Sequence, residues 1–420
     1  MNQSKDPAVS VSDAEALASA ERYLMNTYRR PPVVFDHGRG CKLYESLGRA
    51  YLDFLGGLAV NALGYSHPRI VKVIRREAGR AIHLSNLFHN QFQGPLARKL
   101  VEWSGMDRVF FTNSGTEAVE GAVKLARAFA RNQTPGPVPK TRILALENSF
   151  HGRTLGALSL TYTEKYRTPF TPLMPGVEFV RFNDVADLES KFDESVCAFI
   201  AEPVQGEGGI HAVSDAFWMR ARALATQHRA ALIADEIQCG LGRTGRYFAY
   251  QKFGGPECFP DIVTIAKPLA AGIPLGAMLA REEVAFAFSP GIHGTTFGGG
   301  PLACATALEF LRVVEDEHLL ENVRERGEEI RAGLQRLAAR FDFIREVRGE
   351  GLILGLELSI DGRPLVDEAL RQGLLINCTH ERTLRFLPPF IIRPADVKAF
   401  LRKLKTVLAS ASQLDRAGAP

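Results

Sequence analysis

Long apolar runs, paired cysteines and clustered basic residues are all scarce in this sequence, and each absence excludes a class of protein. No apolar stretch reaches the roughly 18 residues that a membrane-spanning helix requires. The six cysteines, at positions 41, 197, 239, 258, 304 and 378, form no CxxC pair, which argues against a disulfide framework or a structural zinc site. The 51 basic and 47 acidic residues leave a net charge of only +4 with no long basic run, so nucleic acid is not a favoured partner.

The remaining composition is that of an ordinary globular protein. Hydrophobic residues make up 46% and charged residues 23% of the chain, and 420 residues suffice for two or three domains. Residues 1–7 are polar and lack the apolar core of a signal peptide. Cys197 lies inside an apolar run, as a buried reduced thiol would. We therefore expect a cytoplasmic protein.

Seven short apolar runs between residues 108 and 280 are typical of buried strands. They span residues 108–112, 142–146, 177–182, 197–201, 231–234, 262–266 and 275–280. Most are separated by a segment long enough for a crossover helix, as parallel strands require. Only residues 268–274 separate the last two runs, which is too short for such a helix. We therefore expect an α/β fold with a mostly parallel seven-stranded sheet that contains one antiparallel strand.

The two ends of the chain predict a smaller α/β region. Near the start, a helix at 13–28 precedes short strands between residues 33 and 54. Near the end, strands at 343–348, 352–358 and 384–386 precede an amphipathic helix at 395–410. We expect an N-terminal segment (1–64) that packs with a C-terminal small α/β domain (316–420), and a large domain (65–315) between them.

Two of the predicted strands end abruptly in charge, at Asp235 and at Lys267. Taken singly, an aspartate after a strand is usually a cap or turn former, and a lysine there is usually a surface residue. On neighbouring parallel strands, however, both side chains would face the crevice in which open α/β sheets bind ligands. We interpret the pair as bracketing pyridoxal phosphate, with Lys267 bonded to the aldehyde and Asp235 keeping the ring nitrogen protonated.

The segment 110–117 leads from a strand directly into a helix. Ser114 and Glu117 fit a capping box, and Gly115 lets the backbone approach a ligand closely. Free amides at a helix start bind anions, so we place the cofactor phosphate at Gly115 and Thr116. The alternative is a well-capped helix without a ligand.

A second candidate segment, 148–154, follows another predicted strand. Phe150 can stack on an aromatic cofactor ring, and Arg153 can clamp a carboxylate with two parallel hydrogen bonds. In isolation, the same residues would be interpreted as an aromatic core residue beside a surface arginine.

Two further patterns are decoys. Residues 240–245 match the dinucleotide pattern GxGxxG but do not open an apolar helix within a βαβ unit. Residues 232–236 resemble the Mg²⁺-binding strand of an ATPase, yet the chain contains no GxxxxGK loop followed by Ser or Thr. We retain an NAD-dependent oxidoreductase built on residues 240–245 only as a remote alternative. A binding or scaffold protein, in which Lys267 would be idle, is a non-enzymatic alternative.

Six segments together resemble the class III aminotransferases, which depend on pyridoxal phosphate and have the fold-type I architecture. They begin at Asn113 (NSGTEA), Phe150 (FHGRT), Glu202 (EPVQGEGG), Asp235 (DEIQCGLGRTG), Ala266 (AKPLAAGIPLG) and His293 (HGTTFGG). The resemblance runs from about residue 23 to the C-terminal helix. Within the class, segments 23–28, 58–64 and 384–389 are most similar to the acetylornithine aminotransferases.

The resemblance implies a role for individual residues. Lys267 and Asp235 would be catalytic, and Lys267 would also shuttle a proton. Cofactor contacts would come from Ser114, Gly115, Thr116, Phe150, His151, Asp235, Ile237, Gln238 and Lys267, with Thr296 supplied by the other subunit of a homodimer. Substrate contacts would come from Tyr28, Arg153, Glu207, Thr295 and Arg385. Arg385 would bind the second carboxylate of glutamate or 2-oxoglutarate, and Glu207 would neutralise Arg385 when the donor has none. No metal is implied.

The expected activity is transfer of the side-chain amino group of N-acetylornithine to 2-oxoglutarate, giving glutamate and N-acetylglutamate semialdehyde in arginine biosynthesis. Ornithine, succinylornithine, 4-aminobutyrate and acetyl-lysine remain alternative donors within the same class. Two positions depart from the usual family pattern. Gly300 and Val119 each stand where asparagine is frequent. Neither position is a cofactor contact in the family pattern, so the departures make only the subfamily assignment less distinct.

Overall fold

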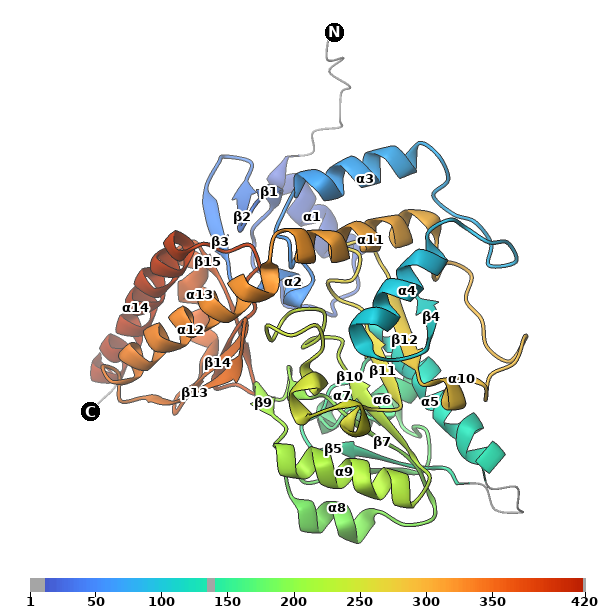
Figure 1. Cartoon of the computed structure of the whole chain (residues 1–420). Coiled ribbons are helices and arrows are strands. Elements are labelled where there is room, and N and C mark those ends of the chain that lie inside the picture. Colours follow the sequence, from blue (N-terminus) through green and yellow to red (C-terminus); the bar gives the residue numbers. More distant parts are fainter. Residues whose placement is uncertain (1–11, 134–139, 418–420) are drawn as a thin grey trace.

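The computed structural model describes residues 12–133 and 140–417, and it contains the seven-stranded sheet that the sequence predicts (Figure 1). The strands are β4 (Arg108–Thr112), β5 (Arg142–Leu146), β6 (Val177–Val180), β7 (Val196–Ala201), β10 (Ala231–Asp235), β11 (Ile262–Ile265) and β12 (Gly276–Ala280). They lie in the order β4-β12-β11-β10-β7-β5-β6. β12 runs antiparallel to both β11 and β4, and the other described pairs are parallel. The predicted single antiparallel strand is therefore confirmed.

Both faces of this sheet are buried, which explains why its strands are continuous apolar runs. Alternate residues of β5 point to opposite sides: Ile143 and Ala145 pack in the same cluster as Val119 and Ala122, whereas Leu144 and Leu146 join the main core. The first face is covered by α5 (Gly115–Gln133), which contacts five of the strands. On the other face lie α4 (Gln93–Ser104), α9 (Asp215–Gln227) and α8 (Val185–Lys191).

The C-terminal region has a second sheet of four strands, in the order β13-β14-β17-β16. Its strands are β13 (Ile344–Glu350), β14 (Ile353–Leu358), β16 (Asn377–Thr379) and β17 (Thr383–Phe386). Around it pack α12 (Leu319–Ala338), α13 (Arg363–Arg371) and α14 (Pro394–Ala417). Figure 1 shows this region, in orange and red, beside the seven-stranded sheet.

The N-terminal strands join the C-terminal region through a third sheet. β1 (Phe35–Arg39), β2 (Lys42–Glu45) and β3 (Ala50–Asp53) form a meander, and β3 pairs in parallel with β15 (Leu374–Leu375). Main-chain bonds from Leu52 to Gly373 and from Phe54 to Leu375 hold the two chain ends together. This pairing places the segment that contains β3 beside the one that contains β15.

The remaining helices connect these sheets or cover their edges. They are α2 (Gly56–Ala59), α3 (Pro68–Ala78), α6 (Leu155–Ser159), α7 (Glu164–Arg167), α10 (Glu282–Ala285) and α11 (Pro301–Asp316). A short hairpin of β8 (Val204–Gln205) and β9 (His211–Ala212) follows β7. Among the described residues, no helix combines the length and the apolar character that crossing a bilayer would need.

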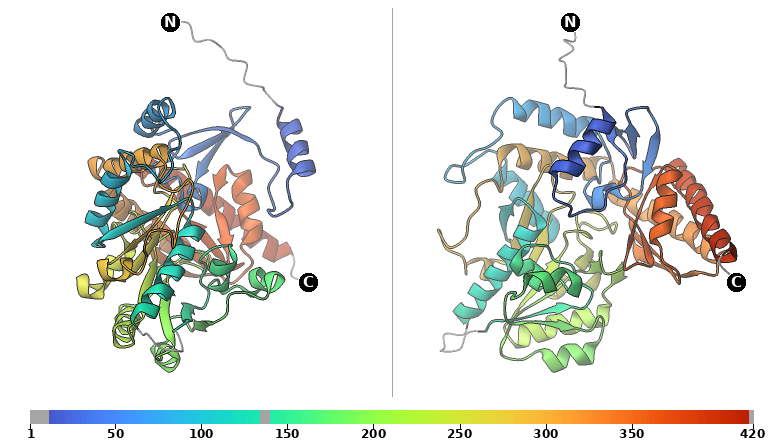
Figure 2. Two further views of the ribbon diagram at one scale, coloured as in Figure 1. Left: turned by 90° about the vertical axis from the view of Figure 1, so that its right-hand side faces the viewer. Right: turned by 180° about the vertical axis from the view of Figure 1, so that it is seen from behind.

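Several expected boundaries were wrong, among them the ends of α1, of β6 and of α14, which ends at Ala417 rather than at residue 410. The first helix, α1 (Asp13–Tyr23), ends at Tyr23 rather than near Tyr28. None of its residues is buried and it lies at the edge of the molecule (Figure 2), so no tertiary packing extends it. Strand β6 ends at Val180 rather than at residue 182, because Asn183 adopts a left-handed backbone with φ of 58° that turns the chain.

Candidate active site

A cavity of about 420 Å³ lies at the carboxyl ends of the parallel strands, and most of the predicted site residues line it. Its walls come mainly from five segments at or after the ends of β4, β5, β7, β10 and β11, and Val60 adds a contact from the N-terminal region. The lining residues that the sequence predicted are Ser114, Gly115, Thr116, Phe150, His151, Arg153, Asp235, Ile237, Gln238 and Lys267. This position is the one at which open α/β sheets bind ligands, and the volume suits a small aromatic phosphate.

The carboxylate of Asp235 is held by three donors. Its Oδ2 lies 2.6 Å from Nδ1 of His151, and its Oδ1 accepts bonds of 3.1 Å from the Thr264 hydroxyl and the Ile237 amide. The side chains of His151 and Asp235 are both buried. Because an ionised carboxylate can only accept, Nδ1 of His151 carries the proton in this pair. These three contacts hold the carboxylate of Asp235 in one orientation at the cavity.

Lys267 reaches the same cavity from the neighbouring strand. β10 and β11 are parallel, and Asp235 lies opposite Thr264. Lys267 comes three residues after Thr264, so it lines the same cavity as Asp235 at the ends of the two strands. Burial lowers the pKa of the Lys267 amine, while the nearby carboxylates of Glu207 and Asp235 oppose this shift. A lysine with a lowered pKa is more often unprotonated, as an amine that attacks an aldehyde and then moves a proton must be.

The start of α5, where the sequence predicts the anion site, lines the cavity. Ser114 Oγ accepts from the Glu117 amide at 3.3 Å, as in a capping box, but the Glu117 carboxylate accepts from the Asn113 amide rather than from that of Ser114. A Cβ added to Gly115 would lie 2.8 Å from Cδ1 of Ile237. The backbone at Gly115 is therefore packed too closely for a larger residue, and the first residues of a 19-residue helix line the cavity, where free amides could bind an anion.

Phe150 and Arg153 line the cavity from the loop after β5. The main-chain amide of Phe150 donates to Oε1 of Glu202 at 2.9 Å, and this bond holds the backbone that carries the Phe150 side chain. The guanidinium of Arg153 lies 3.7 Å from the centre of the Tyr166 ring and 5.5 Å from that of Phe150. Arg153 is exposed, so its forked donors remain available to a ligand carboxylate.

The predicted pair of Glu207 and Arg385 is in contact. Nη1 of Arg385 lies 2.7 Å from Oε1 of Glu207 and donates to Oε1 of Gln238 at 3.0 Å, and its Nε donates to Asn377 at 3.2 Å. Arg385 is fully buried, whereas the Glu207 side chain is 35% exposed. Nη2 of Arg385 is one of the buried polar atoms for which the described residues supply no partner. Arg385 thus has donor capacity left for a second anion.

Sequence reasoning missed a role for Glu202, which also lines the cavity. Its two oxygens accept from the amides of Phe150 and Gly206, at 2.9 and 3.0 Å. They thereby join the loop after β5, which carries Phe150, to the β8–β9 hairpin, which carries Glu207. Burial raises the pKa of Glu202 to about 7, and Asp235 adds to the increase. Glu202 directly follows β7 at the same sheet edge as Asp235, so the strand-end rule could have identified it.

Five predicted residues do not line this cavity. Glu207 and Arg385 adjoin it through the bond from Arg385 to Gln238, and the other three are Tyr28, Thr295 and Thr296. Tyr28 is 69% exposed and contacts Arg30. Thr295 and Thr296 line a different cavity, of about 770 Å³, although Thr295 accepts a 3.3 Å bond from Asn113, which lines the first. Within one chain, Thr296 therefore does not meet the other cofactor residues.

The other expectations concern residues outside the cavity walls. All six cysteines are free thiols, and Cys197 is buried, as expected. Residues 240–245 form turns after β10 and open no helix, so the dinucleotide interpretation has no structural support. Val119 is fully buried in α5 and Gly300 directly precedes α11, and neither lines the cavity. No cluster of metal-ligating side chains occurs within the described ranges.

The residues present fit pyridoxal phosphate. Asp235 supplies a stabilised carboxylate for the ring nitrogen, and Lys267 supplies an amine for the aldehyde. The close backbone at Gly115 leaves the helix amides for the phosphate, and Nε2 of the buried His151 is a further polar atom without a partner among the described residues. These groups all line one cavity of suitable size.

Comparison with known proteins supports the same assignment. The model of the family described as aminotransferase class-III matches residues 23–408. The chain is 44% identical to the acetylornithine aminotransferase of Methanocaldococcus jannaschii over 387 residues, which cover 92% of this chain and 96% of that protein.

Solved structures agree with the sequence relatives. An ornithine aminotransferase of Toxoplasma gondii, crystallised with partial occupancy of PLP at its active site, superposes with a TM-score of 0.92 at 34% identity, covering 96% of each chain. The acetylornithine aminotransferase of Elizabethkingia anophelis gives 0.84 at 30% identity, covering 96% of this chain and 100% of the other. The protein therefore belongs to the class III aminotransferases and, as an enzyme of that class, has pyridoxal phosphate as its cofactor.

Proposed function

We propose that this aminotransferase moves the side-chain amino group of N-acetylornithine to 2-oxoglutarate, producing glutamate and N-acetylglutamate semialdehyde for arginine biosynthesis. The observation that carries the proposal is the contact of Glu207 with the buried Arg385 beside the Lys267 cavity. The sequence relative from Methanocaldococcus jannaschii, which bears the acetylornithine aminotransferase name, supports this choice of donor.

Each cavity residue would contribute one part of the chemistry. When bound, pyridoxal phosphate withdraws electrons from the carbon that loses its proton. The Asp235 carboxylate, held by His151 and Thr264, would keep the ring nitrogen protonated. Nζ of Lys267 would take the proton from the donor carbon and return it, because its lowered pKa leaves the amine able to act as a base. Phe150 would keep one face of the ring dry.

The pair of Glu207 and Arg385 would let one site accept two kinds of substrate. 2-Oxoglutarate has a second carboxylate, which could bind Arg385 with two parallel hydrogen bonds once Glu207 moves away. The donor has no second carboxylate, and Glu207 would then stay on Arg385, since a buried unpaired cation is costly. Glu207 is partly exposed in the loop between β8 and β9, so it has room to move.

We also propose a homodimer with active sites at the subunit interface. Ile82, Leu87, Phe88 and Phe297 are large apolar side chains that are each more than 60% exposed. Their loops lie side by side, because Asn86 donates to the carbonyls of residues 295 and 298. An exposed apolar patch of this kind suits a protein partner. In such a dimer, Thr296 of each subunit would reach the cofactor site of the other subunit and complete it.

The proposed organisation is a large cofactor-binding domain (65–315) and a small domain formed by residues 1–64 and 316–420. The pairing of β3 with β15 supports joining the two chain ends. We further infer a cytoplasmic location, which six free thiols and a need for dissolved metabolites both favour.

A donor screen tests the proposed function. The purified enzyme is incubated with 2-oxoglutarate and one of N-acetylornithine, ornithine, succinylornithine, 4-aminobutyrate or acetyl-lysine, and glutamate release is measured. We expect the highest kcat/KM for N-acetylornithine. The Lys267→Ala variant is the control; it should lose both turnover and the absorption band of the lysine-bound cofactor. A higher kcat/KM for ornithine would transfer the assignment to that donor, which the similarity to the Toxoplasma gondii enzyme makes the second candidate.

A further inference from the structure

Arg243 is a buried cation to which the described part of the chain supplies no carboxylate partner. It lies in the glycine-rich segment 240–245 that follows β10, and it is only 1% exposed. No ion pair joins it to any described acidic residue, and its guanidinium instead lies 4.5 Å from the centre of the Phe390 ring. Burial lowers the pKa of Arg243 to about 9. A cation kept in such surroundings costs stability, so its contacts point to a role beyond packing.

The contacts that Arg243 makes with described residues distant in the sequence are all with the C-terminal region. Its Nη1 donates to the carbonyls of Leu352 and Pro388, and its own carbonyl accepts from the Leu352 amide at 2.9 Å. Leu352 directly precedes β14, and Pro388 follows β17 by two residues. One side chain therefore bonds to residues next to the ends of β14 and β17, the two central strands of the C-terminal sheet.

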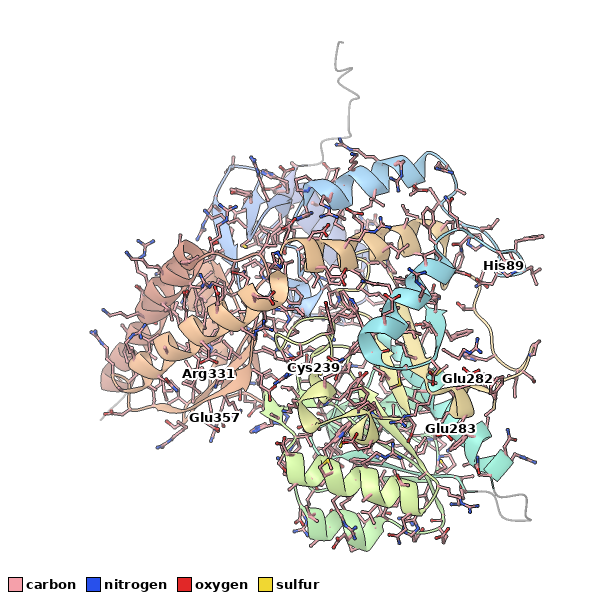
Figure 3. The ribbon with its side chains drawn as sticks, viewed as in Figure 1. His89, Cys239, Glu282, Glu283, Arg331 and Glu357 are labelled. Carbon is pink, nitrogen blue, oxygen red and sulfur yellow. The ribbon has the colours of Figure 1, made fainter. Side chains whose placement is uncertain are left out.

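The glycines of the same segment allow this close approach. A Cβ on Gly242 would lie 3.0 Å from the Phe390 ring, and one on Gly245 would lie 2.5 Å from Cγ of Arg324. Across the contact, a Cβ on Gly351 would lie 2.6 Å from the carbonyl oxygen of Arg243. The pattern that mimics a dinucleotide fingerprint thus marks a joint between the cofactor sheet and the C-terminal region. Figure 3 labels Cys239, just before this joint, near the centre of the molecule between the two sheets.

The two strands next to these contacts, β14 and β17, are those that position Arg385. β14 and β17 are antiparallel neighbours, with Gly355 opposite Arg385 and Leu354 opposite Phe386. Arg385 is three residues before Pro388. On the other side of the joint, Arg243 is five residues after Gln238, whose amide oxygen accepts from Arg385. Arg243 and the contact of Gln238 with Arg385 therefore bridge the same two segments at neighbouring points.

We propose that Arg243 is a positioning residue for Arg385: it fixes the height of the Arg385 guanidinium above the Lys267 cavity and so sets the affinity for the dicarboxylate substrate. The inference rests on the proposed role of Arg385. Two parallel hydrogen bonds to a carboxylate require the guanidinium to be placed within a fraction of an ångström, whereas an amino donor that leaves Glu207 on Arg385 does not depend on that placement.

The test compares the two half-reactions of the holoenzyme in Arg243→Gln and Arg243→Lys. The KM for 2-oxoglutarate should rise by roughly 10-fold in Arg243→Gln, with a smaller rise in Arg243→Lys, which keeps the charge but not the planar fork. The single-turnover rate and KM with N-acetylornithine, followed by the change in cofactor absorbance, should stay within about 2-fold of wild type. The matched control is Arg324→Gln, which loses a bond to the Gly245 carbonyl in the same joint but touches neither Leu352 nor Pro388. It should leave both half-reactions unchanged.

The outcomes separate this inference from the proposed function. If Arg385→Gln itself leaves the KM for 2-oxoglutarate unchanged, the role of Arg385 fails and the inference fails with it. Suppose instead that Arg385→Gln raises the KM for 2-oxoglutarate. If the Arg243 variants then change neither the KM for 2-oxoglutarate nor that for N-acetylornithine, or raise both equally, only the inference is overturned. Should Arg243→Gln not fold, Arg243→Lys and Phe390→Leu are judged by the same split between the half-reactions. Failure of all three to fold would overturn the inference in favour of a purely structural role.

Discussion

Nδ1 of His151 lies 2.6 Å from Oδ2 of Asp235, and this buried contact ties the loop after β5 to the end of β10. Through this contact the histidine holds the carboxylate in one orientation. The hydroxyl of Thr264 does the same for the other oxygen, at 3.1 Å. The orientation of the Asp235 carboxylate at the end of β10 is therefore fixed by a residue of the loop after β5 and a residue of β11 before any ligand binds.

Replacing Asp235 with asparagine should lower kcat by roughly 10²- to 10³-fold, the scale expected when one pre-organised charge is lost at a reacting centre. The asparagine keeps the size of the side chain, so cofactor binding should persist. Stopped-flow or steady-state kinetics with N-acetylornithine would measure kcat, and the cofactor absorbance would measure occupancy. Thr264→Val, which removes only one donor, is the matched variant and should cost far less. Near-normal turnover of Asp235→Asn would remove its assigned role.

The substitution Glu207→Gln should shift the preference of the enzyme towards dicarboxylates. It removes the charge that neutralises Arg385, so the KM for N-acetylornithine should rise by roughly 10-fold while that for 2-oxoglutarate stays the same or falls. Arg385→Gln should do the reverse, raising the KM for 2-oxoglutarate by roughly 10- to 100-fold. Steady-state kinetics with each substrate varied in turn measures both effects. Parallel changes in the two variants would contradict a switch between partners.

A Gly115→Ala substitution should weaken cofactor binding by at least about 10-fold, because the added methyl would lie 2.8 Å from Ile237 and push the helix start out of place. Equilibrium titration of the cofactor-free protein with pyridoxal phosphate measures the effect. Gly94→Ala is a matched control, since Gly94 also lies in the first turn of a helix and a Cβ there meets no atom within 4 Å. Equal affinities of the two variants would argue against a phosphate site at Gly115.

Most of the cavity could be predicted from the sequence because its residues follow strands that are recognisable one at a time. Asp235, Lys267 and Ser114 each end or follow a short apolar run, and parallel strands bring such ends to one edge. Glu202 also directly follows a strand, but its role depends on its bonds to the amides of Phe150 and Gly206, which the sequence does not reveal.

Contacts between distant segments could not be predicted in this way. Gln238 was expected at the cofactor ring only, yet its amide oxygen also accepts from Arg385, which is 147 residues away. Residues 240–245 could be rejected as a dinucleotide site, but no local pattern shows that their glycines receive Phe390 and Arg324. The end of α1 was misplaced because a helix without buried residues takes no stability from the core.

Two buried glutamates predict that the cofactor-free protein loses stability as the pH rises. Burial raises the pKa of Glu236 to about 7, as it does for Glu202, from an ordinary value of 4.5. The folded state thus holds these protons more tightly than the unfolded state. Their contribution to the free energy of unfolding is fully present below pH 4.5 and is lost as the pH rises through 7, by at most ~1.4 kcal/mol per pH unit for each group.

The measurement is chemical denaturation between pH 5.5 and 8.5. Glu236→Gln cannot ionise, so its unfolding free energy should fall less steeply over this range, although one bond from the Ala249 or Tyr250 amide is lost at every pH. Glu328→Gln, at a side chain that is 75% exposed, should retain the wild-type slope. An unchanged slope in Glu236→Gln would show that Glu236 is already ionised in the folded protein at low pH.

Complementation between two inactive variants would test whether Thr296 acts across a subunit interface. Thr296 lines a different cavity from Lys267 within one chain, so a contribution to the cofactor phosphate would have to come from a second copy. Lys267→Ala removes the essential amine, and Thr296→Asp sets a negative charge against the phosphate. Each homodimer should be nearly inactive.

In a heterodimer of the two variants, one site would combine both defects and the other neither. Heterodimers purified through two different affinity tags should therefore regain about half of the wild-type activity, because a twofold axis gives two equivalent sites. If Thr296 acted on the site of its own subunit, every site would retain one defect and no activity would return. Thr226→Asp, at an exposed threonine on α9 away from both cavities, is the control that should be active even as a homodimer. Recovery only in the heterodimer would thus establish both the dimer and the residue that completes its sites.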